Sequence, residues 1–164
     1  MTMLFFRKKI PIDDIGRFLA FCVVGPEIPE DLITELKKAG FFISKIEKVF
    51  FELKYLRVYI IAFKVVEILG KNKTTDQILI SFYGTLKNEN IIIPEIYLEK
   101  SAHYSKALDE ANADTSLYTK NICQKFSEFC GYREHYLLAQ ITSWEIENIN
   151  NYGSSPKRVG KNEV

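Results

Sequence analysis

Residues 44–70 read SKIEKVFFELKYLRVYIIAFKVVEILG, and this stretch decides the predicted fold. Apolar side chains recur through it at steps of three and four residues, which is the spacing of one helix face. Ser44 and Glu47 fit a capping box at the start, and Gly70 can end the helix. A helix over about residues 45–69 with so wide an apolar face is typical of the centre of a bundle, where it is contacted from several sides.

Helix signals continue on both sides of this segment. Prolines are placed to open three further helices, at Pro11, Pro29 and Pro94. Side-chain caps are expected for two more, at Thr74 or Thr75 and at Asp114 or Thr115. Gly131 ends the second of these, and a last helix begins near Tyr132. The chain is therefore predicted to be all-α, a single-domain helical bundle of about six or seven helices around one long central helix.

Two details of packing follow from the same pattern. In the first predicted helix, the residues expected to point inward are Ile12, Ile15, Phe18, Leu19 and Cys22. Arg57 lies in the most apolar region, so we expect its stem to cover apolar surface while its charged head reaches water. If it were buried instead, it would need a carboxylate partner such as Glu52 or Glu67.

The chain has 164 residues, a hydrophobic content of 47% and a net charge of +1, which fits one folded domain and makes nucleic acid an unfavoured partner. Residues 1–10 form a basic and apolar N-terminal arm, and residues 11–150 form the helical domain. Residues 151–164 are polar, and we expect them to form a flexible C-terminal tail.

The cysteines and the apolar runs indicate a cellular setting. The chain has an odd number of cysteines, the three residues Cys22, Cys123 and Cys130, and no Cys-x-x-Cys pair. Free thiols in the cytoplasm are therefore predicted. The N-terminus lacks the order of a secretory signal. Residues 49–69 are the most apolar stretch, but they carry five charged side chains, too many for a membrane span.

Catalytic or metal-binding residue types occur in the sequence only as isolated candidates. No phosphate-binding glycine loop, dinucleotide fingerprint or nucleophile elbow is present, so no enzymatic signature and no cofactor are predicted. Glu99 and His103 are four residues apart and could begin a metal site, although an exposed ion pair explains them as well. His135, beside Glu134, could act as an acid or base if it lay in a pocket.

Aromatic content is the most unusual feature, with twelve phenylalanines and nine tyrosines. Five of these rings are candidates for an interface or a ligand-facing surface: Phe51, Tyr55, Tyr59, Tyr97 and Tyr104. Tyrosines combine an apolar body with a polar tip, which suits the rim of the protein's own core, a subunit interface or a pocket between helices.

These observations lead to three hypotheses about function. The first is a helical protein that acts by association, with itself as a homo-oligomer or with an unknown protein partner. The second is a binding module for a small apolar or amphipathic ligand held between helices. The third is a metal-dependent or acid–base enzyme that uses His103 or His135 with nearby carboxylates.

Overall fold

The computed structural model describes residues 10–25, 27–112 and 114–153. This part of the chain holds seven helices and no strand: α1 (Ile12–Val24), α2 (Glu30–Lys38), α3 (Ile43–Leu69), α4 (Lys73–Asn88), α5 (Pro94–Ala111), α6 (Thr115–Phe129) and α7 (Tyr136–Gly153). The prediction of an all-α bundle around one long helix is confirmed. The arm expected at 1–10 and the tail expected at 151–164 lie largely outside the described residues, and their boundaries stay predictions.

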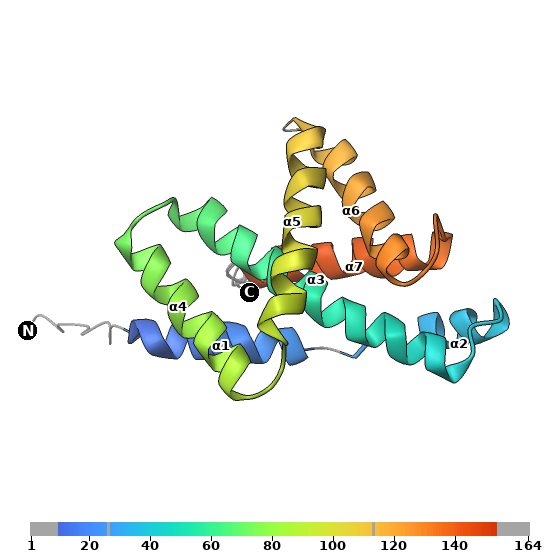
Figure 1. Ribbon diagram of the computed structural model, residues 1–164, viewed down its shortest axis with the longest axis horizontal. Coiled ribbons are helices and arrows are strands. Elements are labelled where there is room, and N and C mark those ends of the chain that lie inside the picture. The colour runs from blue at the N-terminus through green and yellow to red at the C-terminus, as the bar shows by residue number, and fades with distance from the viewer. Residues whose placement is uncertain (1–9, 26, 113, 154–164) are drawn as a thin grey trace, which may run out of the picture.

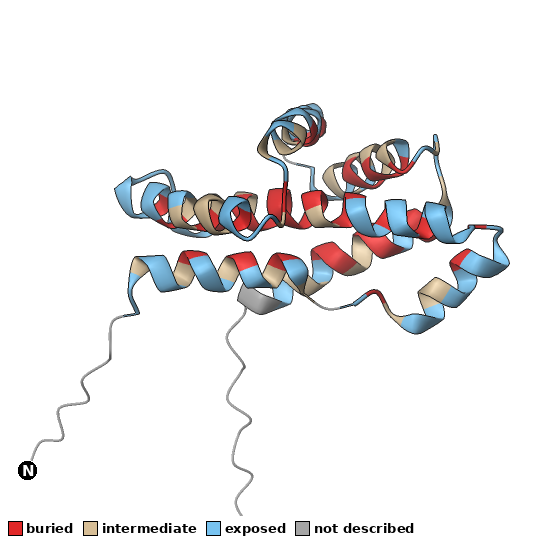
Figure 2. Cartoon of the chain, turned by 60° about the horizontal axis from the view of Figure 1, so that its bottom comes forward, coloured by how far each residue is buried: buried red, intermediate tan, exposed pale blue. Residues whose placement is uncertain are grey.

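Helix α3 runs through the middle of the molecule, and the others are arranged around it (Figure 1). It contacts α1, α4, α5, α6 and α7. Helices α1 and α4 pack closely against each other, α5 pairs with α6, and α6 pairs with α7. Buried residues gather where these helices meet (Figure 2). The long helix therefore occupies the central position that its apolar pattern predicts.

Opposite sides of α3 belong to two separate parts of the core. Leu53 and Leu56 pack in the part formed with α2, α5, α6 and α7. Tyr55, Val58 and Ala62 pack in the part formed with α1 and α4. A helix that is apolar all round must be buried all round, and the middle of α3 meets this requirement.

Several helix ends lie where the local sequence places them. Pro94 is the first residue of α5, and Gly70 follows α3 with φ +74°. Asp114 caps α6, because its Oδ1 accepts hydrogen bonds from the amides of Ser116 (2.9 Å) and Leu117 (3.1 Å). These predictions are confirmed, and each depends only on residues next to the helix end.

Two predicted caps are wrong. Helix α3 begins at Ile43, with Phe42 before it and no side-chain cap, so Ser44 already lies inside the helix and cannot form the capping box. Helix α4 is capped by Asn72, whose Oδ1 accepts from the amides of Thr74 (2.9 Å) and Thr75 (3.0 Å). The threonines supply backbone donors here, and the asparagine supplies the acceptor.

The predicted inward face of α1 is right only in part, because Leu19 and Cys22 pack half-buried against the core but are not the most buried residues of the helix. The buried residues of α1 are Gly16, Ala20 and Val23, whereas Phe18 is 64% exposed. Small residues at positions four apart let α1 approach α4 closely, and the Ser81 hydroxyl donates to the Asp13 carbonyl across the contact (3.1 Å). The inward face was predicted from the spacing of large apolar side chains, so the small residues that make this contact were not identified.

Arg57 is buried, contrary to the expectation that its head reaches water. Its Nε and Nη2 atoms donate to the two carboxylate oxygens of Glu145 on α7 at 2.8 and 3.0 Å. Its Nη1 donates to the Val23 carbonyl at 3.2 Å. The partner is therefore neither Glu52 nor Glu67, and Glu52 instead pairs with Lys100 at 2.6 Å. A carboxylate 88 residues away was required to neutralise the buried guanidinium.

Candidate functional site

A groove of about 780 Å³ lies among α3, α4 and α5. We call it the α3–α4–α5 groove. In Figure 1, α4 lies on the left, α3 crosses the middle and α5 stands upright near the centre. Its lining residues are Tyr59, Ala62, Phe63, Val66, Lys71, Leu79, Tyr83, Gly84, Lys87, Ile92, Pro94, Tyr97, Leu98, Ser101, Ser105 and Leu108.

Each wall of the groove is one face of a helix. Helix α3 contributes four residues from two successive turns of one face: Tyr59, Ala62, Phe63 and Val66. Helix α4 contributes Leu79, Tyr83 and Lys87, which are four residues apart, and α5 contributes a similar stripe that begins at Pro94. The lining is predominantly apolar. Its polar groups belong to two lysines, two serines and the hydroxyls of three tyrosines, and none of the described residues that line it is acidic.

Gly84 leaves open space in the α4 wall of the groove. A Cβ atom built at this residue meets no atom within 4 Å, so the empty space reaches the helix backbone itself. A glycine inside a helix costs roughly 1 kcal/mol of stability relative to alanine. The space beside Gly84 could therefore accept a larger side chain without a clash, which provides a direct way to fill the groove.

Tyr83 and Tyr97 connect α4 to α5 at one end of the groove. Their hydroxyl oxygens are 2.9 Å apart, and their ring centroids are 5.4 Å apart. Burial raises the pKa of both tyrosines above the ordinary value. Both hydroxyls therefore keep their hydrogens through neutral and mildly alkaline pH, and they remain available as donors.

Lysines stand at both ends of α4. Lys71 precedes the helix and Lys87 lies in its last turn, so the two are separated by the helix length of about 24 Å for 16 residues. Both side chains are exposed, and neither forms an ion pair with another described residue. The groove therefore combines an apolar interior with positive charge at its ends.

The structure separates the five aromatic residues that the sequence singled out. Tyr59 and Tyr97 line the groove. Tyr55 and Tyr104 are buried in the two parts of the core, where the Tyr55 hydroxyl accepts a hydrogen bond from the Ile93 amide (3.2 Å). Phe51 is 37% exposed and lines a different hollow, near the end of α1.

Tyr83, Gly84 and Lys87 were missed by the sequence reasoning. The four-residue step from Tyr83 to Lys87 is visible in the sequence and places both side chains on one face of α4. Nothing local indicates that this face meets a groove, because the space depends on how far α5 stands from α4.

The metal candidates do not come together with further ligands. Glu99 and His103 are both exposed on α5, and the His103 ring contacts the edge of Phe129 with a centroid distance of 5.7 Å. In the residues that the structure describes, no three histidine, cysteine, aspartate or glutamate side chains are grouped to hold a metal ion.

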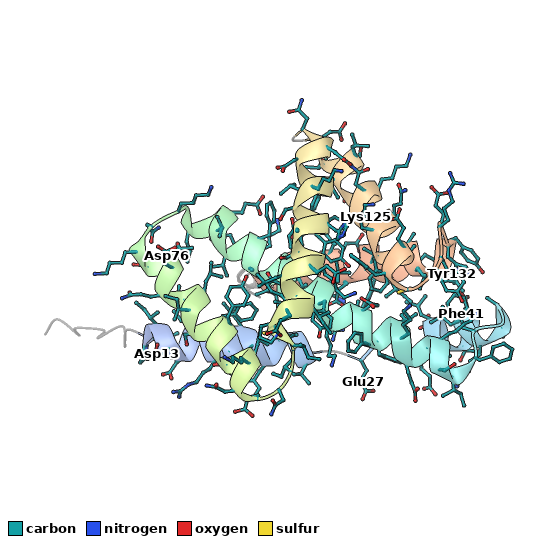
Figure 3. The ribbon with its side chains drawn as sticks, viewed as in Figure 1. Asp13, Glu27, Phe41, Asp76, Lys125 and Tyr132 are labelled. Atoms are coloured by element: carbon teal, nitrogen blue, oxygen red, sulfur yellow. The ribbon has the colours of Figure 1, made fainter. Side chains whose placement is uncertain are left out.

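His135 has a structural task at the start of α7. The helix begins at Tyr136, later than the sequence pattern indicates. The Nδ1 atom of His135 accepts a hydrogen bond from the Leu137 amide at 3.3 Å, and its ring packs against Phe41 and Tyr132, the stacked pair labelled in Figure 3. One ring nitrogen is therefore occupied by the helix end.

Cys123 lines the same hollow as His135 between α6 and α7, a proximity that the sequence did not indicate. Burial raises the pKa of the Cys123 thiol, which lowers the fraction of reactive thiolate. With the thiol protonated and His135 Nδ1 bonded to the backbone, this hollow lacks the activated pair that nucleophilic catalysis requires.

Comparison with known proteins finds no matching family model, no matching curated protein and no matching solved structure. Function is therefore inferred from the geometry of the groove. Among the described helices, none combines the length and the apolar character needed to cross a membrane.

Proposed function

We propose that this protein is a binding module for single-chain apolar or amphipathic molecules, which it holds in the α3–α4–α5 groove. One observation carries the proposal: the groove is an open hollow of about 780 Å³ whose lining is dominated by apolar side chains. Binding sites for small molecules typically have volumes of about 300–1,000 Å³, with mostly apolar walls and a few placed polar groups. The groove has this size and this chemistry.

The lining also leaves apolar surface that a ligand would cover. Leu98 is 66% exposed, and Phe63, Val66 and Leu79 are partly exposed. Each square ångström of apolar surface removed from water contributes about 25 cal/mol. Rings that pack on each other, such as Tyr59 and Phe63 with centroids 6.4 Å apart, keep the walls in place before a ligand arrives. A preformed site loses less entropy on binding.

The test uses the neutral fluorescent probe N-phenyl-1-naphthylamine, whose emission rises in apolar surroundings. We expect saturable binding to the wild-type protein. Gly84→Phe places a ring in the empty space beside α4 and should weaken binding of the probe at least about tenfold, because it removes volume and contact area.

Ile80→Phe is the matched control, because Ile80 is exposed on the same helix and does not line the groove. It should bind the probe as the wild type does. Circular dichroism of both variants verifies that the helices are retained. Absence of saturable binding to the wild type, or equal binding by Gly84→Phe, would contradict the proposed function.

Self-association is a second candidate function, and we propose α1 as its surface. The outer side of α1 leaves Phe18, Phe21 and Val24 largely exposed. Phe18 and the exposed Ile68 of α3 also line a small hollow of about 140 Å³. Exposed apolar patches of this kind mark interaction sites more often than ordinary surface does.

Sedimentation velocity over a range of concentrations tests this second candidate. A dimer or larger oligomer in the wild type, converted to a monomer by Phe18→Ser with Phe21→Ser, would support it. A monomer at all concentrations would contradict it.

We also propose that the protein resides in the reducing cytoplasm, which is supported by its three free cysteines. Fractionation of cells that produce the protein would test this location.

A further inference from the structure

The Tyr83–Tyr97 pair has one hydrogen that its own contact does not use. Each hydroxyl carries one hydrogen and can donate one hydrogen bond. The two oxygens lie 2.9 Å apart, so one hydroxyl donates to the other. Neither hydroxyl has another hydrogen-bond partner among the described residues, and both side chains line the groove. The second hydrogen is therefore available to an acceptor atom in the groove.

Lys87 brings positive charge to the same wall. It follows Tyr83 by four residues on α4, which places the two side chains on one face of the helix. No acidic side chain lines the groove in the described part of the chain, so nothing in the lining neutralises the ammonium group. An anionic group of a ligand would meet both a hydroxyl donor and a positive charge at this end.

The number of donors distinguishes between anionic groups. One free hydroxyl hydrogen and one ammonium group match the two oxygens and the single negative charge of a carboxylate. A phosphate monoester carries a charge of about −1.5 to −2 and three acceptor oxygens, so it would stay under-neutralised here. We infer that the α4–α5 end of the groove binds the carboxylate of a fatty acid through the Tyr83–Tyr97 hydroxyl pair and Lys87. This inference rests on the proposed function of the groove.

The rest of the groove provides a place for the alkyl chain. From Tyr83 the α4 wall continues to Leu79, and the facing α3 wall continues through Phe63 to Val66. Lys71 stands at this far end, without a hydroxyl pair beside it among the lining residues. The two lysines thus lie at the two ends of one groove, and the carboxylate is assigned to the end that holds Lys87 and the hydroxyl pair.

The first experiment measures how well dodecanoate and dodecanol, both below their aggregation concentrations, displace N-phenyl-1-naphthylamine. The two ligands have the same chain length and differ in the charged group. We expect dodecanoate to bind the wild type about tenfold more tightly, because a hydrogen bond to a charged group contributes more than a neutral one. Lys87→Met should remove this preference, and the matched control Lys71→Met should keep it.

The second experiment uses the double variant Tyr83→Phe with Tyr97→Phe. It removes both hydroxyls and keeps both rings, so the affinity for the neutral probe should stay within about twofold of the wild type. The affinity for dodecanoate should fall about tenfold. A single substitution leaves one hydroxyl free to donate, so it is a less decisive variant.

The outcomes separate this inference from the proposed function. One outcome is that the probe binds the wild type and Gly84→Phe blocks it, while dodecanoate and dodecanol bind equally well. This result would support the proposed function of the groove and overturn the carboxylate site. Equal losses in Lys87→Met and Lys71→Met would also overturn it, because both ends would then act alike. If neither the probe nor dodecanoate binds the wild type, both the inference and the proposed function are overturned.

Discussion

The two sides of α4 meet their neighbours in opposite ways. On the side of α1, Gly16 lies so close that an added Cβ would stand 2.5 Å from the Ser81 Cβ and 2.8 Å from the Phe82 amide nitrogen. On the side of α3 and α5, a Cβ added at Gly84 would meet nothing within 4 Å. Both glycines lie inside helices, yet one permits close packing and the other borders an empty groove.

The difference shows that the neighbouring side chains decide what a helical glycine does. Helix α1 presents the small residues Gly16 and Ala20 to α4, so the two backbones approach. Helix α5 presents Tyr97, whose ring meets that of Tyr83 at a centroid distance of 5.4 Å. Two aromatic rings between α4 and α5 hold these helices apart, and the space beside Gly84 stays open.

The largest expected effect concerns the attachment of α1. Arg57 bonds the Val23 carbonyl at the end of α1 and Glu145 on α7. Glu145→Ala should lower the free energy of unfolding by about 3–5 kcal/mol in urea denaturation, because it leaves a buried guanidinium without its counter-charge. The double variant Arg57→Met with Glu145→Met should recover most of this loss. A loss below about 1 kcal/mol in Glu145→Ala would show that the Arg57–Glu145 pair does not anchor α1.

The next effect tests the close contact itself. Gly16→Ala should lower the free energy of unfolding by about 1–3 kcal/mol, because the methyl group overlaps Ser81 and the backbone of Phe82, which cannot move without shifting α4. Thermal unfolding checks this, since 1 kcal/mol corresponds to about 2–4 °C for a chain of this size.

A glycine-to-alanine substitution on the groove side of α4 should change stability in the opposite direction. Gly84→Ala should raise the free energy of unfolding by about 0.5–1 kcal/mol, because alanine favours the helix and its methyl group meets open space. Thermal unfolding of both alanine variants in one buffer makes the comparison direct. Similar shifts in the two variants would remove the contrast between the sides of α4.

The smallest expected effect is a difference between two cysteines in their rate of reaction with an alkylating reagent. Burial raises the pKa of Cys130 to about 12, and it raises the pKa of Cys22, which is only partly buried on α1. At mildly alkaline pH, iodoacetamide should therefore label Cys22 first, as read by peptide mass spectrometry, since a thiol must be both accessible and ionised to react. Faster labelling of Cys130 would show that the core around α6 opens often enough to make Cys130 more accessible than Cys22.

Much of the fold could be predicted because helix signals are local. Gly70, Pro94 and Asp114 each mark a helix end through their own backbone or side-chain chemistry. The predicted cap at Ser44 was wrong because the cap position of α3 is Phe42, two residues earlier, so the Ser44 side chain lies inside the helix.

Less of the candidate site could be predicted. Tyr59 and Tyr97 were singled out by their amphipathic character, and both line the groove. Tyr55 and Tyr104 share that character but are buried, because they point from α3 and α5 into the core. Residue type therefore identified two lining residues without distinguishing them from two core residues.

The sequence by itself determined that the protein is helical and that α3 is its centre, because periodicity and helix ends depend on neighbours along the chain. Only the tertiary structure decided that Arg57 pairs with Glu145, that α1 packs through its small residues and that a groove opens beside Gly84. These features depend on distances between segments far apart in the sequence, and such distances are set when all seven described helices pack together.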